Sequence, residues 1–136
     1  MNERIKDKIK DIEIFLDELE SVLPSSFEEY ANDFKIKAIG ERYFEKIIES
    51  VIDLAFFVIK DKHFKTPEED KQAFDILYEN EIISYELSEK LKEAKGMRNI
   101  IAHEYGKIDD ELVFNSLTEE LIKDASEFSD IIKKLK

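Results

Sequence analysis

YFEKIIESVIDLAFFVI, residues 43–59, is the stretch of sequence that decides the fold. Its apolar side chains recur every three or four residues, which is the spacing of one face of an α-helix. From Val51 to Ile59 the segment becomes apolar on nearly all sides. Such a helix either lies at the centre of a bundle or is buried twice, in its own core and against a second chain. We expect the second arrangement, because a domain of this size has little room to cover the helix completely.

The same helical periodicity begins before this stretch. It extends from Phe27 to about Lys60, so we expect one long helix there, with an N-cap from the pair Ser25-Ser26. Gly40 lies inside this helix and indicates a bend or a close contact with another helix, because glycine costs about 1 kcal/mol relative to alanine in a helix interior. Further upstream, spacings of four and three residues predict a first helix ending at Pro24, with the inward residues Ile5, Ile9, Ile12, Leu16, Leu19 and Leu23.

Downstream of the decisive stretch, capping signals predict three more helices. Thr66-Pro67-Glu68-Glu69 has the form of a capping box with proline at the first helical position, and that helix should stop near Asn80. Ser84 is placed to cap the next helix, and Gly106 to end it. A final helix should begin near Asp110 and continue towards the end of the chain.

Length and composition agree with a helical fold. The chain has 136 residues, of which 43% are hydrophobic, three are glycine and two are proline. This length suits one domain with one core, and so few turn residues argue against a β-sandwich or β-barrel. We therefore expect a single all-α domain over residues 1–136, an antiparallel bundle of about four to five helices that forms a symmetric dimer.

Several functional classes are excluded by composition. The absence of cysteine excludes disulfides, a thiolate nucleophile and cysteine-ligated metal centres. The carboxylates are scattered along helix faces, so we expect no metal and no cofactor. No apolar signal-peptide core follows Met1, and the longest apolar stretch is about half the length of a membrane helix. We therefore expect a soluble, cytoplasmic protein without a membrane partner.

The net charge of −12 restricts any interaction with nucleic acid. A protein that binds nucleic acid over a broad surface is normally basic, because it must neutralise phosphates. This chain would have to engage phosphate through a local basic site.

The segment RNIIAHEY, residues 98–105, offers residues suited to chemistry. On an ideal helix, Arg98 and Tyr105 differ by only about 20° around the axis, so they share a face, whereas His103 lies about 140° from Arg98. Arg98 and His103 could therefore meet only if the helix end unwinds or a second chain completes the site. The other histidine, His63, lies in a polar linker and is interpreted as a solvated loop residue.

Arginine and histidine together could cleave RNA without a metal. Arginine matches a phosphate with its planar fork, and histidine exchanges protons near neutral pH. Histidine would move the proton of the ribose 2′-hydroxyl or protonate the leaving oxygen, which gives a 2′,3′-cyclic phosphate. The spacing alone is also compatible with a histidine that only pairs with the carbonyls at a helix end.

At these residues the chain resembles a known family. Arg98-Asn99-Ile100-Ile101-Ala102-His103 is similar to the Arg-x4–6-His signature of HEPN domains, and His103-Glu104-Tyr105 extends it to the form found in HepT-like toxins. The resemblance implies a dimeric ribonuclease toxin with paired motifs, in a type VII-like pair with a minimal nucleotidyltransferase (MNT) antitoxin that transfers AMP to a tyrosine. By position it makes Arg98 and His103 catalytic, Asn99 a supporting residue and Tyr105 the AMP acceptor. RNA is the implied substrate, and the toxin–antitoxin pair could form a larger hetero-complex.

Two other interpretations remain open. The chain could be a non-catalytic HEPN module that docks a nucleotidyltransferase or a nucleotide, or a plain structural dimer that uses the surface from Val51 to Ile59. Substrate affinity in the leading interpretation depends on Arg98 and on the neighbouring lysines Lys92, Lys95 and Lys107, which Glu93 and Glu104 oppose.

Overall fold

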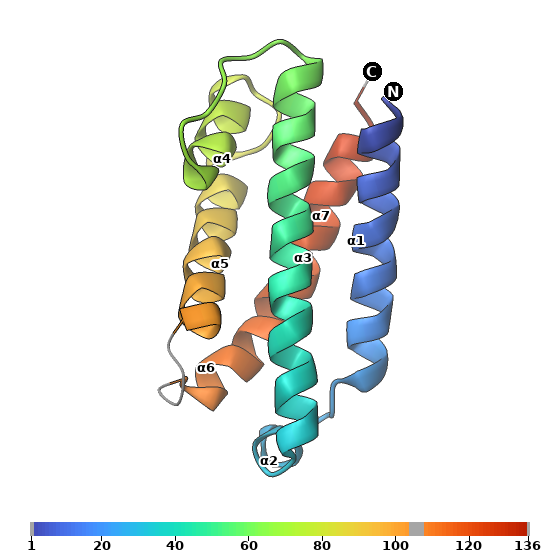
Figure 1. The fold of residues 1–136 in the computed structure, drawn as a ribbon, viewed down its shortest axis with the longest axis vertical. Coiled ribbons are helices and arrows are strands. Elements are labelled where there is room, and N and C mark those ends of the chain that lie inside the picture. The colour runs from blue at the N-terminus through green and yellow to red at the C-terminus, as the bar shows by residue number, and fades with distance from the viewer. Residues whose placement is uncertain (1, 104–107, 136) are drawn as a thin grey trace.

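The computed structural model describes residues 2–103 and 108–135, and every regular element in these ranges is a helix (Figure 1). This confirms the all-α expectation. None of these helices combines the length and the hydropathy needed to cross a membrane. In chain order the elements are α1 (Glu3–Val22), α2 (Phe27–Ala31), α3 (Phe34–Asp61), α4 (Asp70–Glu79), α5 (Tyr85–His103), α6 (Asp110–Asn115), the π-helical segment η1 (Ser116–Leu121) and α7 (Ile122–Lys133).

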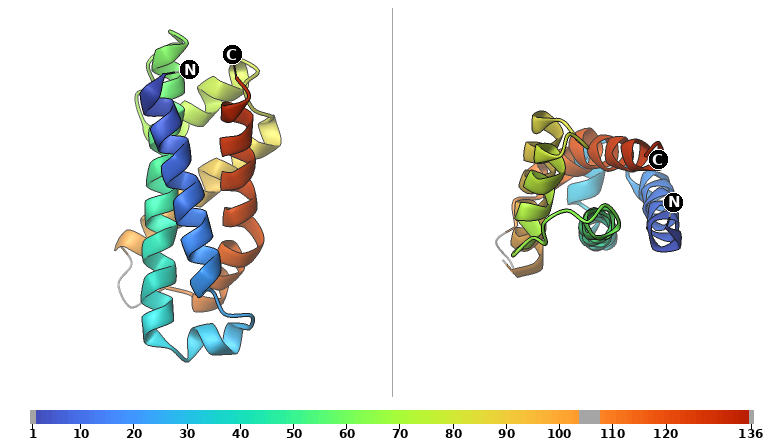
Figure 2. Two further views of the ribbon diagram at one scale, coloured as in Figure 1. Left: turned by 90° about the vertical axis from the view of Figure 1, so that its right-hand side faces the viewer. Right: turned by 90° about the horizontal axis from the view of Figure 1, so that it is seen from above.

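Helix α3 is the centre of the bundle. Helix α1 packs along one side of it, α4 and α5 along the other, and α7 lies behind (Figures 1 and 2). Helices α1 and α5 run antiparallel to α3, so the C-terminal end of α3 lies at the same end of the molecule as both chain termini (Figure 1). The C-terminal end of α5 lies towards the opposite end, beside the first half of α3.

A single chain buries most of the apolar stretch of α3. The side chains of Val51, Leu54, Ala55, Val58 and Ile59 are all at most 3% exposed. One domain therefore covers more of this helix than we expected from the sequence, because α1, α4, α5 and α7 all contact it. Phe56 and Phe57 stay partly exposed. The dimer remains a prediction, and the apolar stretch no longer argues for it.

The long helix expected from Phe27 is interrupted. It breaks at residues 32–33, and Asp33 caps the new start, since its Oδ1 accepts hydrogen bonds from the backbone N–H groups of Lys35 (2.9 Å) and Ile36 (3.2 Å). Asp33 satisfies two of the free donors at a helix start, which a continuous helix would not need. The preceding cap agrees with expectation, because Ser26 Oγ accepts from Glu29 N–H at 3.2 Å.

Gly40 marks a close helix contact, one of the two roles expected for it. A Cβ atom at this position would lie 3.0 Å from Leu117 Cδ1 and 3.1 Å from Tyr30 Cε2. The missing side chain therefore allows α3 to approach both α2 and η1.

The start expected for α4 is wrong by several residues. The helix begins at Asp70, and Pro67 is a buried residue of the preceding loop. Thr66 does not cap the helix, and the N-cap residue Glu69 makes no side-chain cap hydrogen bond; Gln72 Oε1 accepts a hydrogen bond from the backbone N–H of Glu68, in the loop before the helix, at 2.7 Å. The end at Asn80 and the cap at Ser84, whose Oγ accepts from Leu87 N–H at 3.0 Å, are confirmed. Gly106 lies outside the described residues.

The C-terminal helix begins at Asp110 as expected, but it contains a wide turn. Segment η1 joins α6 directly to α7. Buried residues in and beside η1 recur every four positions (Val113, Leu117, Leu121 and Ala125). On an ideal α-helix each of them would be rotated by about 40° from the one before, so the series would gradually turn away from the core. The i→i+5 turn absorbs that drift and keeps the four side chains on the core.

Candidate functional site

The side chain of Arg98 extends from α5 towards α3, and its guanidinium donates hydrogen bonds to two acceptors. Its Nη2 donates to Glu49 Oε1 at 3.2 Å, and its Nη1 donates to Asn99 Oδ1 at 3.3 Å. The Nε atom is buried and has no partner among the described residues. The Arg98 side chain is 24% exposed, so part of the guanidinium remains open to a ligand.

Glu49 is a residue of this site that sequence reasoning missed. It is 49 positions from Arg98 in the chain and lies on the central helix α3. No local motif links the two residues, because only the packing of α3 against α5 brings them together.

His103 is the last described residue of α5 and is exposed. Asn99 precedes it by four positions, so these two side chains are neighbours on one face of the helix. Arg98 instead faces α3, and no described hydrogen bond joins it to His103. Asn99, which contacts Arg98 and neighbours His103, thus lies between the two. Tyr105 lies outside the described residues.

Of the two described lysines of α5 expected to support Arg98, Lys92 is paired with carboxylates, whereas Lys95 has no ion pair among the described residues. Lys92 Nζ bonds to Asp75 Oδ1 at 2.8 Å and to Glu89 Oε2 at 2.6 Å, and these hydrogen bonds raise its pKa above the usual range. Lys92 is therefore already neutralised by two carboxylates. Lys107 lies outside the described residues.

The groove beside the end of α5 is acidic. It has a volume of about 590 Å³ and is lined by Lys37, Glu41, Glu45, Ile101, Ala102, Ile108 and Asp110. Its lysine, Lys37, is bound to Asp110 at 2.9 Å. Burial raises the pKa of Glu41, and the nearby charge of Asp110 raises it further. This groove would repel phosphate.

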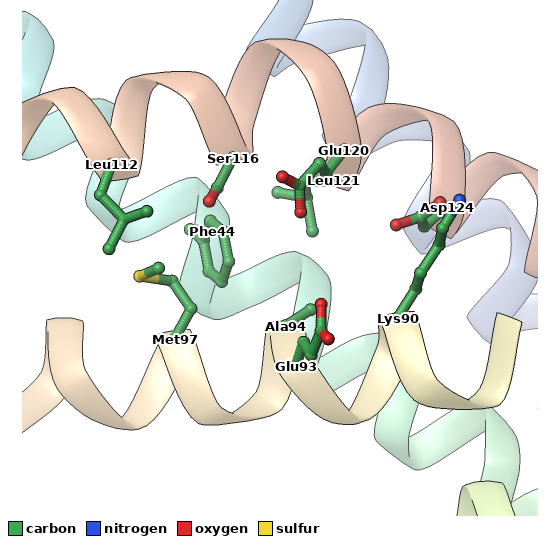
Figure 3. Close-up of a pocket in the computed structure, with 10 residues that line it drawn as sticks. All are labelled: Phe44, Lys90, Glu93, Ala94, Met97, Leu112, Ser116, Glu120, Leu121 and Asp124. Atoms are coloured by element: carbon green, nitrogen blue, oxygen red, sulfur yellow. The ribbon is translucent and has the colours of Figure 1, made fainter. Parts of the chain in front are cut away.

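A second cavity lies between α5 and the continuous run of α6, η1 and α7 (Figure 3). It has a volume of about 200 Å³, and its lining consists of Phe44, Lys90, Glu93, Ala94, Met97, Leu112, Ser116, Glu120, Leu121 and Asp124. Ala94 and Met97 pack against the core. Figure 3 shows Lys90 reaching towards Asp124, and burial raises the pKa of that aspartate while Lys90 lowers it. Arg98 and His103 do not line this cavity, so it is separate from the motif.

His63 is an exposed loop residue, as interpreted from the sequence. It follows α3 with φ of 60°, a left-handed conformation, and its N–H donates to Lys60 O at 3.2 Å. Among residues 2–103 and 108–135, no group of three or more histidine or carboxylate side chains is placed to hold a metal ion.

Comparison with known proteins places this chain in a family. The family described as "Ribonuclease HepT-like" matches residues 5–135. The chain is 26% identical over 133 residues to the mRNA nuclease HepT of Shewanella oneidensis, covering 98% of each protein. It is 26% identical over 114 residues to the tRNA nuclease HepT of Aphanizomenon flos-aquae, covering 84% of this chain and 78% of that protein.

A solved structure is similar over the full length. It is the tri-AMPylated HEPN toxin of Shewanella oneidensis in complex with its MNT antitoxin. The TM-score is 0.91 at 26% identity, with 99% of this chain and 100% of that chain covered.

Proposed function

Because this chain belongs to the ribonuclease HepT-like family, we propose that it is a metal-independent endoribonuclease toxin in which Arg98 and His103 carry the reaction. Two relatives are named as HepT nucleases, and a structural neighbour is a HEPN toxin bound to an MNT antitoxin. These relatives support a ribonuclease toxin with a nucleotidyltransferase antitoxin. The observation that carries the chemical proposal is the partly exposed side chain of Arg98, whose guanidinium is held by Glu49 and Asn99 five positions before the histidine at the end of α5.

The proposed reaction is an internal transesterification. His103 accepts the proton of a ribose 2′-hydroxyl, whose oxygen attacks the adjacent phosphorus. Arg98 binds the non-bridging oxygens and stabilises the charge that develops on the phosphorane. A protonated histidine then donates its proton to the departing 5′-oxygen. The products are a 2′,3′-cyclic phosphate and a 5′-hydroxyl.

The divergent directions of Arg98 and His103 support a composite site. Residues five positions apart point about 140° away from each other on a helix, so one chain does not aim both at the same phosphate. We infer a homodimer whose interface includes the exposed face of α5 with Asn99, Ile100 and His103. Ile100 is 43% exposed, which makes it an apolar contact available to a second copy. Each guanidinium would then share a site with the partner's imidazole.

Inhibition is proposed to act through Tyr105. The antitoxin would transfer AMP to its hydroxyl, and a continued helix would place that residue on the same side as Arg98. The adenylate phosphate would then bind the arginine and repel RNA. The tri-AMPylated HEPN toxin of Shewanella oneidensis supports inhibition by AMPylation, and the choice of Tyr105 rests on the motif.

The ion pair between Arg98 and Glu49 favours a second candidate function. A guanidinium already neutralised by a carboxylate suits a non-catalytic module that docks a nucleotidyltransferase or a nucleotide. Expression of this chain alone separates the two functions, because a ribonuclease toxin arrests growth and a docking module does not.

The proposed chemistry is tested with purified protein and labelled RNA in EDTA. The wild-type protein should produce cyclic phosphate ends, and His103→Ala should lower the rate by about 10²- to 10⁴-fold, the usual contribution of a general acid or base. Glu20→Ala, at an exposed position of α1 outside the site, is the control and should cleave like the wild type. Equal cleavage by wild type and His103→Ala would refute the assignment.

A further inference from the structure

The basic residues of this acidic chain are concentrated at one end of the bundle. The start of α1, the end of α3 and the end of α7 meet there (Figures 1 and 2). Segments 2–10, 60–65 and 130–135 together contain nine lysines or arginines and four aspartates or glutamates. Because the whole chain has a net charge of −12, this end is strongly different from the rest of the surface.

A groove at this end combines cations with aromatic rings. It has a volume of about 610 Å³, and no acidic side chain is among its described lining residues. A neighbouring groove of about 410 Å³ shares four of them, Arg4, Phe57, Lys60 and His63, and is also lined by Asn2, Glu3 and Asp61. The Arg4 guanidinium lies 5.9 Å from the centre of the Phe57 ring. We call the first groove the basic groove; it is lined by Arg4, Phe56, Phe57, Ile59, Lys60, His63, Phe64, Thr66 and Pro67.

Cations interleaved with aromatic rings are the combination that binds single-stranded nucleic acid. Lysine and arginine neutralise the phosphates, and bases stack on the rings without strong sequence preference. The groove therefore has the chemistry for an oligonucleotide backbone and one or two unpaired bases.

The surroundings of the candidate site are acidic, so RNA binding there needs support from another, basic surface. The groove beside the candidate site contains Glu41, Glu45 and Asp110, and the nearby Lys92 is held by two carboxylates. Among the described cations of α5 at that end, Lys95 and Arg98 remain to attract RNA, and Arg98 is itself paired with Glu49. A substrate held only there would bind weakly against the acidic surroundings.

The basic groove and the contact between Arg98 and Glu49 lie along the same face of α3. Lys60 is eleven residues beyond Glu49, which corresponds to about 16 Å along the helix axis and about 20° around it. Asp53, the carboxylate between them, is paired with Lys8 at 3.5 Å. A stacked strand advances about 3.4 Å per nucleotide, so about five nucleotides span this distance.

From these observations we propose that the basic groove is a second RNA site, which holds a single-stranded segment of the substrate about five nucleotides from the bond at Arg98. This inference rests on the proposed ribonuclease function, because it assigns the anchoring of the same substrate. Its ligand is an oligoribonucleotide, not a free mononucleotide.

The test measures the binding of a fluorescent single-stranded 20-nucleotide RNA to the His103→Ala protein at several salt concentrations. Arg4→Ala and Lys60→Ala should each weaken binding several-fold and reduce the slope of log affinity against log salt by about 0.7, the value for one lost contact with a single strand. Lys35→Ala, at the opposite end of α3, is the matched control and should bind unchanged. Circular dichroism spectra check that each variant is folded.

Two outcomes overturn the proposal. One is wild-type affinity and salt slope in both Arg4→Ala and Lys60→Ala. The other is competition by AMP at concentrations as low as those of the oligonucleotide, which would identify a mononucleotide site.

Cleavage assays separate this proposal from the proposed function. Arg4→Ala and Lys60→Ala, in an otherwise wild-type chain, should raise KM for the long RNA and leave cleavage of a trinucleotide unchanged, because a trinucleotide cannot reach both sites. If the wild-type protein cleaves nothing but the groove variants still lose RNA binding, the ribonuclease assignment fails and the groove assignment stands. If it cleaves while the variants bind normally, only the groove assignment fails.

Discussion

Arg98 Nη2 on α5 and Glu49 Oε1 on α3 lie 3.2 Å apart and form an ion pair across the helix interface. This pair connects the proposed catalytic arginine to the most buried helix of the bundle. It orients the guanidinium, and it also competes with a phosphate for the same donors. The balance between these effects can be measured with substitutions of the carboxylate.

We expect Glu49→Ala to lower kcat by about tenfold or more, because a hydrogen bond to a charged group contributes about 1.5–3 kcal/mol to holding its partner. Glu49→Gln keeps an acceptor for the arginine and should retain most of the rate, with a lower KM because a negative charge is removed. Steady-state cleavage kinetics distinguish the two variants. Identical kinetics for Ala and Gln would show that Glu49 does not position Arg98.

Arg98→Lys should abolish most cleavage although it conserves the charge. A lysine presents one compact ammonium group, and it cannot contact Glu49, Asn99 and a phosphate at once with a planar fork. Cleavage rates of Arg98→Lys and Arg98→Ala should therefore be similarly low. Near-normal activity of the lysine variant would indicate that the arginine acts only as a diffuse positive charge.

Tyr105→Phe should separate cleavage from inhibition. The substitution removes the hydroxyl that would accept AMP and leaves Arg98 and His103 unchanged. We expect the variant to cleave RNA at close to the wild-type rate and to gain no AMP when incubated with an MNT-type nucleotidyltransferase and ATP. Intact mass spectrometry with peptide mapping locates the modification, and an adenylate found on another residue contradicts the assignment.

Gly40→Ala should destabilise the fold by about 1–3 kcal/mol, the usual cost of overpacking a core. The new Cβ would lie 3.0 Å from Leu117 and 3.1 Å from Tyr30, and both neighbours are fully buried. Gly96→Ala is the matched control in α5, where the nearest atom is Lys71 Nζ at 3.9 Å; it should stabilise the protein by about 0.5–1 kcal/mol. Denaturant unfolding measures both changes. A gain of stability in both variants would show that α3 does not need the close approach.

Asp124→Asn should stabilise the protein at neutral pH. Burial raises the pKa of Asp124 above its ordinary value of 3.8, although Lys90 and Lys123 oppose the shift and Glu120 and Glu127 add to it. A raised pKa means that the folded state binds the proton more tightly than the unfolded chain, so the wild type loses stability as pH rises through the folded pKa. The advantage of the asparagine variant should therefore grow with pH and vanish in acid.

Thermal unfolding across the pH range measures this difference. Asp130→Asn, an exposed position on α7, is the control and should show no comparable gain. An advantage for Asp124→Asn that is constant at all pH values would contradict the role of burial.

Much of the scaffold could be predicted from the sequence because its helices are strongly amphipathic. The inward residues of α1 follow a regular spacing, and the structure buries Ile5, Ile9, Ile12, Leu16 and Leu19 as expected. Helix boundaries were less predictable where capping signals compete. Asn32-Asp33 is a local cap inside a continuous apolar pattern, and Pro67 fills a buried loop position although it resembles a helix start.

Only part of the candidate site could be predicted from the sequence. The spacing of Arg98, His103 and Tyr105 identified the segment, because neighbouring residues on one helix have fixed relative directions. Glu49 could not be identified in this way, since its contact with Arg98 depends on how α3 packs against α5. The basic groove was missed for the same reason, because its residues come from separated parts of the chain.

The wide turn at residues 116–121 holds one residue more than an α-helical turn would. Each residue of an α-helix rotates the next one by about 100°, so deleting a residue from an ordinary helical segment would turn the residues after it, such as Phe128 and Ile132 of α7, away from the interior. Deleting one residue within the wide turn would instead convert it to an α-helical turn and leave α7 facing the core. Relatives whose last helix differs in length by one residue should therefore differ at this turn.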